Sequence, residues 1–105
     1  MRATTLGSLD VSVVGLGCNH FGRALDQAST NTVVSAALDA GITFFDTASN
    51  CGEGQSERFL GHALGARRDE VIIATKFGMA VPGAPGLEGA RPETIHASVD
   101  RSLRE

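Results

Sequence analysis

The 105-residue chain has no tryptophan, no tyrosine, only two cysteines and no excess of basic residues. Cys18 and Cys51 are too few for a disulfide framework or a cysteine-ligated zinc site, and neither belongs to a C-x-x-C pair. Twelve acidic residues against nine basic ones leave a net charge of -3, so the chain lacks the basic surface that drives counterion release on nucleic acid. We expect two reduced thiols, no metal site and no nucleic-acid partner.

Long apolar runs are also missing. No stretch approaches the roughly 18 apolar residues of a membrane span, and the N-terminus lacks the basic region and apolar stretch of a secretory signal. These features predict a cytoplasmic protein without a membrane partner. A hydrophobic content of 42% with 13 glycines is typical of a small globular domain.

Three strand patterns are present. The β-branched residues of "TTLG", "SLD" and "VSVVGLG" surround the turn formers Gly7, Ser8 and Asp10, which predicts a short hairpin followed by a strand. "ITFFD" and "VIIATK" are continuous apolar runs of strand length.

Helical spacing alternates with these strands. We predict a first helix that is capped by Thr30 or Asn31 and stopped by Gly41, and a second helix in "SERFLGHALGARR" with Ser56 as its N-cap. After a loop at 77–90 that is rich in glycine and proline, Pro92 suits the first turn of a third helix. Its expected apolar face consists of Ile95, Val99 and Leu103.

Apolar strands that alternate with amphipathic helices indicate parallel βαβ units. The candidate architectures are a doubly wound Rossmann sheet and an eight-stranded (β/α)8 barrel, which typically needs about 250 residues. The segment "GLGCNHFG" follows a strand, but His20 stands where the G-x-G-x-x-G fingerprint needs glycine. This departure disfavours the Rossmann alternative.

Charged residues end two of the strands. Asp46 follows "ITFF" and Lys76 follows "VIIAT", and both architectures place chemistry at the carboxyl ends of parallel strands. We therefore expect an ion pair between them, with Gly17, Cys18 and Asn19 on the same rim. A buried lysine beside a carboxylate can tune the pKa of a third group. Alternatively, Asp46 only caps a turn and Lys76 only extends to solvent.

The three histidines have no metal-ligand spacing. His62 and His96 fall within predicted helices, where a partly exposed structural histidine is the usual case. His20 lies in the loop after the first parallel strand and is a candidate for substrate contact.

Taken together, "GLGCNHFG", "ALDAGITFFDTASNCGEGQSERFLGHAL" and "RRDEVIIATKFG" resemble the aldo/keto reductases in order from about residue 4 onward. The resemblance rests on Asp-Thr-Ala after an apolar strand, Gly52, then Ser56-Glu57 and Leu60-Gly61, and a strand that ends in Thr-Lys. It implies a (β/α)8 TIM barrel that transfers hydride from NADPH, or NADH, to an aldehyde or ketone.

The resemblance also implies roles for individual residues. Asp46 and Lys76 match the family's catalytic aspartate and lysine, and Gly17, Cys18, Asn19 and Asp46 fall where the nicotinamide ribose would lie. In the family's scheme a tyrosine protonates the developing alkoxide, the lysine lowers its pKa and the aspartate holds the lysine. This agrees with the electrostatic argument for the ion pair.

Cys51 stands at the position of that tyrosine. Its sulfur is on a one-carbon stem and cannot reach where a phenol oxygen would lie, so we interpret the cysteine as a lesion. The alternative is a redox or nucleophilic cysteine near Lys76, which requires a lowered thiol pKa. A disulfide with Cys18 is geometrically conceivable but disfavoured in a reducing compartment.

We therefore predict that residues 1–105 are a partial aldo/keto reductase domain, with a hairpin and about three of the eight βα units, ending within the third helix. We expect the chain to be inactive alone, since the family's histidine and later strands are not in the sequence. The alternative is a non-catalytic module of the same fold that binds a partner. An open sheet edge also predicts self-association.

Overall fold

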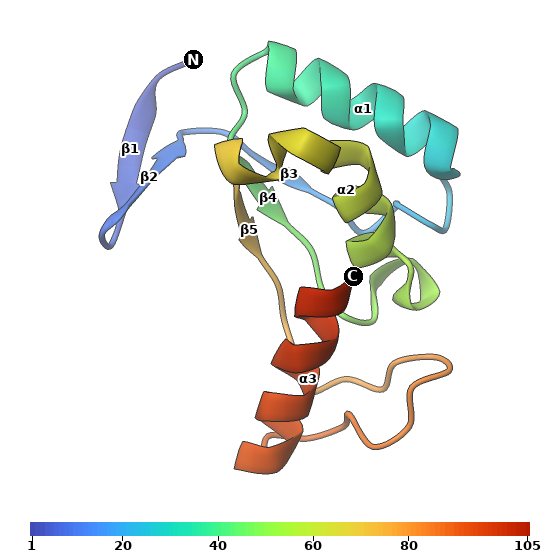
Figure 1. Cartoon of the computed structure of the whole chain (residues 1–105). Helices are drawn as coiled ribbons and strands as arrows, with labels where there is room; N and C mark the ends of the chain where they lie inside the picture. Colours follow the sequence, from blue (N-terminus) through green and yellow to red (C-terminus); the bar gives the residue numbers. More distant parts are fainter.

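The structure is a computed structural model that describes residues 1–105, with two small sheets and three α-helices (Figure 1). At the N-terminus, strand β1 (Ala3–Leu6) pairs antiparallel with β2 (Leu9–Ser12). The turn between them passes through Gly7, whose φ of 64° is readily adopted only by glycine. The predicted hairpin is therefore confirmed.

The second sheet is parallel and has the strand order β3-β4-β5. Its strands are β3 (Gly15–Gly17), β4 (Phe44–Asp46) and β5 (Ile72–Ala74), and they are linked by helices α1 (Gln27–Asp39) and α2 (Ser56–Leu64). Helix α3 (Pro92–Arg104) follows the loop at 77–90. The predicted parallel βα units are confirmed, although each strand is only three residues long and Lys76 lies beyond the end of β5.

Helix α1 begins earlier than the sequence pattern predicts. Its N-cap is Asp26, whose Oδ1 accepts a hydrogen bond of 2.8 Å from the backbone N–H of Ser29. The prediction that Thr30 or Asn31 caps the helix is wrong, because the carboxylate already satisfies a free N–H of the first turn. The predicted stop is confirmed, since the helix ends just before Gly41, which has a φ of 89°.

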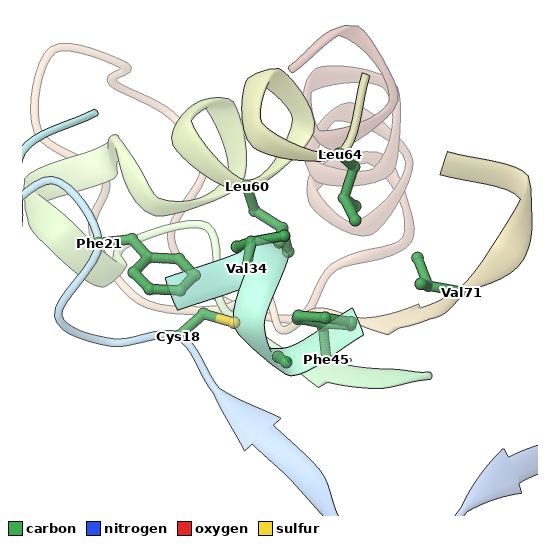
Figure 2. Packing of buried hydrophobic residues seen from close by; sticks show 8 residues of the cluster. Cys18, Phe21, Val34, Phe45, Leu60, Leu64 and Val71 are labelled. Carbon is green, nitrogen blue, oxygen red and sulfur yellow. The ribbon is translucent and has the colours of Figure 1, made fainter. Parts of the chain in front are cut away.

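The core lies between the parallel sheet and helices α1 and α2, which cover the same face (Figures 1 and 2). Phe45, fully buried at the middle of β4, projects toward these helices and is met by Val34 of α1 and Leu60 of α2. The complete cluster consists of Cys18, Phe21, Val34, Ala37, Phe45, Leu60, Leu64 and Val71.

Helix α3 packs through a polar face. The predicted start at Pro92 is confirmed, but the buried residues of the helix are Thr94 and Ser98. Val99 and Leu103, from the face predicted to be apolar and buried, are 49% and 79% exposed. The helix adopts this orientation because its neighbour is the charged first turn of α2, with which it forms an ion pair.

None of the helices is long and apolar enough to cross a membrane. This finding agrees with the hydropathy of the sequence.

Cys18 belongs to the core although it follows β3 directly. Its side chain is only 1% exposed, and its Sγ lies 3.5 Å from the carbonyl oxygen of Leu16. Burial is the main cause that raises the pKa of the Cys18 thiol to about 12, with a smaller contribution from the charge of Asp46. Both cysteines are free thiols.

This burial predicts a difference in alkylation between the two cysteines. Because the Cys18 thiol stays protonated until the pH approaches about 12, iodoacetamide at pH about 8 should modify the half-buried Cys51 and spare Cys18. Peptide mass spectrometry measures both sites, and unfolding in urea provides the control in which both react. Native Cys18 reacting as fast as Cys51 would contradict this placement.

Candidate functional site

Asp46 and Lys76 meet at the carboxyl end of the parallel sheet. The strand register pairs Gly17 with Asp46 and Asp46 with Ala74. Lys76 therefore lies two residues beyond Ala74, the residue that is level with Asp46 in the sheet. The Lys76 Nζ donates to Asp46 Oδ1 at 2.6 Å and to the carbonyl oxygen of Thr47 at 2.9 Å. The predicted ion pair between adjacent strands is confirmed.

The ion pair faces solvent. The side chains of Lys76 and Asp46 are 59% and 47% exposed, so Lys76 pairs with the carboxylate without being buried. Asp46 shares its face of the sheet with Gly17 and Ala74, and no helix covers that face. An exposed pair of this kind contributes at most about 1 kcal/mol to stability, so its geometry is more informative than its energy.

There is free space beside Asp46. A Cβ added to Gly17 would meet no atom within 4 Å, and Asn19 and His20 are exposed in the following loop. By contrast, the Cys18 side chain points into the core, so only its backbone can face a ligand at this rim. The exposed positions of His62 on α2 and His96 on α3 fit the structural interpretation of these residues.

Cys51 opens the 3₁₀ helix η1 (Cys51–Gly54), and close backbone packing fixes its place. Gly52 has a φ of 58°, and a Cβ there would lie 1.8 Å from the carbonyl oxygen of Phe21. A Cβ on Gly22 would lie 2.5 Å from Cβ of Gln55. The loop after β3 therefore touches η1 backbone to backbone, and only glycine permits this approach.

A chain of buried hydroxyl groups joins three segments of the rim. Ser56 Oγ donates to the carbonyl oxygen of Cys18 at 2.7 Å and lies 2.7 Å from Thr47 Oγ1. The prediction that Ser56 is the N-cap of α2 is wrong: Gln55 holds that position, and the Ser56 hydroxyl is used in this tertiary contact. These bonds hold the ends of β3 and β4 at the start of α2.

The charges at this rim also act on the buried thiol of Cys18. Burial is the largest cause that raises the pKa of the Cys18 thiol; the charge of Asp46 raises it further, and the charge of Lys76 lowers it. The structure thus brings together Gly17, Asp46 and Lys76 around one open surface, whereas Cys51 lies half-buried at the start of η1. Thr47 and Ser56 were missed as site residues because a hydroxyl next to a strand or helix end gives no periodic signal.

Comparison with known proteins agrees with this geometry. Residues 13–105 match the model of the aldo/keto reductase family. Over 80 residues the chain is 39% identical to "Uncharacterized oxidoreductase YqkF" of Bacillus subtilis, which corresponds to 74% of this chain and 26% of that protein. It is 35% identical over 102 residues to "Probable aldo-keto reductase 1" of Glycine max, covering 90% of this chain and 29% of the relative.

Solved structures extend the comparison to the fold. Two structures from Pseudomonas aeruginosa, both described as "putative aldo-keto reductase", superpose with TM-scores of 0.79 and 0.82 at 32% and 33% identity. They align with 97% of this chain, which spans 41% and 40% of their lengths. The α/β fold with its parallel strand-helix units is therefore that of part of an aldo-keto reductase TIM barrel, and the chain belongs to the aldo/keto reductase family.

Proposed function

We propose that this chain carries the aspartate and lysine of an NAD(P)H-dependent carbonyl reductase active site but does not catalyse the reaction alone. The observation that carries the proposal is the 2.6 Å contact of Lys76 Nζ with Asp46 Oδ1 at the rim of the sheet. Cys51 stands at the proton donor's position in the family pattern, on a segment that Gly52 fixes against the loop after β3.

The rim has room for a dinucleotide. The open space at Gly17 and the exposed Asn19 border Asp46, so these residues would hold the nicotinamide ribose. The cofactor, when bound, supplies the hydride that reduces an aldehyde or ketone. Because the chain spans only 26% to 41% of the proteins it matches, most contacts to the cofactor would come from outside these residues.

Lys76 and Asp46 are arranged to assist a proton donor. The carboxylate and the Thr47 carbonyl oxygen take two hydrogen bonds from Nζ, which holds the positive charge at the rim. A positive charge beside a phenol favours its ionised form and so lowers its pKa toward the range of an effective general acid. A cysteine sulfur at position 51 is too close to the backbone to perform this proton transfer.

A chimera tests this proposal. Residues 1–105 would be fused to the five remaining βα units of a close relative, with Cys51 retained or replaced in the variants Cys51→Tyr and Cys51→Ser. Loss of a positioned general acid typically lowers the rate by 10²–10⁴, so we expect Cys51→Tyr to raise aldehyde reduction by about that factor. Cys51→Ser should remain slow, and cofactor fluorescence should show similar binding in all three.

Equal turnover by the cysteine and tyrosine chimeras would refute the lesion interpretation, because Cys51 or a water would then supply the proton. Cofactor binding with no detectable turnover in either the cysteine or the tyrosine chimera would instead favour the second candidate, a non-catalytic module of the same fold.

We also propose that the isolated chain associates with itself. Strands β3 and β5 each leave one edge unpaired. Exposed apolar side chains such as Val99 and Leu103 add hydrophobic surface that favours association. Sedimentation velocity at micromolar concentration should detect oligomers or aggregates. A monodisperse monomer with a sharp cooperative melt would contradict this proposal.

A further inference from the structure

A buried carboxylate lies behind the ion pair, on the helix-covered side of the sheet. Glu57, in the first turn of α2, has a side chain that is only 7% exposed. Its Oε1 accepts hydrogen bonds from Thr75 Oγ1 at 2.5 Å and from Ser102 Oγ at 2.7 Å. Its Oε2 lies 3.6 Å from Arg101 Nη1. Two hydroxyl donors and one guanidinium, from two other segments, therefore surround this carboxylate, and no hydrogen bond reaches Oε2.

A buried carboxylate is stable only when hydrogen-bond donors or a countercharge compensate for its lost hydration. The partners of Glu57 supply this compensation. The start of a helix favours a negative charge at Glu57, but it does not require contacts with two distant segments. Two of these three partners, Ser102 and Arg101, come from α3, and they explain how this helix is anchored. The third partner, Thr75, directly follows the end of β5.

Thr75 connects this carboxylate to Lys76 through a single peptide bond. The strand ladder of β5 ends at Ala74, so residues 75 and 76 extend beyond the regular pairing. Past that point the Lys76 carbonyl oxygen accepts a hydrogen bond of 3.3 Å from the Ser49 N–H. The Thr75 side chain reaches Glu57 on one side of the sheet, while the Lys76 side chain reaches Asp46 on the other.

We propose that Glu57 is a positioning residue for Lys76. By accepting the hydrogen bond from Thr75, its carboxylate fixes the strand end from which the lysine reaches Asp46. The consequence of this positioning for catalysis rests on the proposed function, whereas the position of Lys76 itself is a property of the folded chain. A purely structural role would act through Ser102 and Arg101 and leave Lys76 unchanged.

The two arms of the network can be separated by substitution. Thr75→Val removes the hydroxyl on the Lys76 arm and keeps the shape of the side chain, whereas Ser102→Ala removes the hydroxyl on the α3 arm. Glu57→Ala removes both arms, and Glu57→Gln keeps an oxygen that accepts from Thr75. Glu70→Ala is the matched control, since Glu70 is an exposed acid whose partner is Arg67.

Lys76 is the only lysine in the sequence, which gives a direct readout. An N-hydroxysuccinimide acetate ester modifies only the amines of Lys76 and the N-terminus, and peptide mass spectrometry measures the acetylation rate of each amine separately. Release of Lys76 from its hydrogen bonds should raise its acetylation rate by up to about fivefold. This factor corresponds to the largest stabilisation that an exposed ion pair usually gives. The N-terminal amine serves as an internal reference in every sample.

We expect faster Lys76 acetylation in Glu57→Ala and Thr75→Val, with no further gain in the double variant. Glu57→Gln, Ser102→Ala and Glu70→Ala should retain the wild-type rate. Because Thr75 is at the surface, Thr75→Val keeps the fold even if Glu57→Ala does not, and circular dichroism verifies this.

Unchanged acetylation in Thr75→Val, or an equal increase in Ser102→Ala, would overturn the positioning role. The readout needs neither cofactor nor turnover, so it is independent of the proposed function. Faster acetylation together with an inactive Cys51→Tyr chimera would support the positioning role and reject the catalytic proposal.

Discussion

The parallel pairing of β4 between β3 and β5 is the constraint on which the rest of the structure depends. This register places Gly17, Asp46 and Ala74 in one row and leaves Lys76 just beyond it. Phe45, fully buried on the opposite face, fixes the orientation of β4 against the two helices. A shift by one residue would send Asp46 into the core and Phe45 to the open rim, so burial of the phenylalanine also orients the carboxylate.

The rim is held from both sides of the sheet. On the open side, Lys76 donates to Asp46 and to the Thr47 carbonyl oxygen. On the covered side, the buried hydroxyl of Ser56 joins the ends of β3 and β4 to the start of α2, and Glu57 joins the end of β5 to the same turn. The first turn of α2 is therefore the common support for the three strand ends.

Apolar spacing and turn residues made the hairpin, the parallel units and the Asp46–Lys76 contact predictable from the sequence. Other features depend on contacts that spacing does not encode. Ser56 resembles an N-cap locally, but a carbonyl oxygen 38 residues away accepts its hydrogen bond. Likewise, the apolar side of α3 suggested burial, while its charged contact with Glu57 turns the polar side inward.

The most direct test of the central claim is a titration of the Cys51→Tyr variant of the 105-residue chain. The chain has no tyrosine and no tryptophan, so the phenolate absorbance reports only the introduced side chain. If Lys76 is held ready for a proton donor at position 51, the phenol pKa should fall below its usual value of about 10, and Lys76→Met should restore it. A phenol pKa of about 10 or higher in both variants would contradict the claim that this rim is built to activate a proton donor.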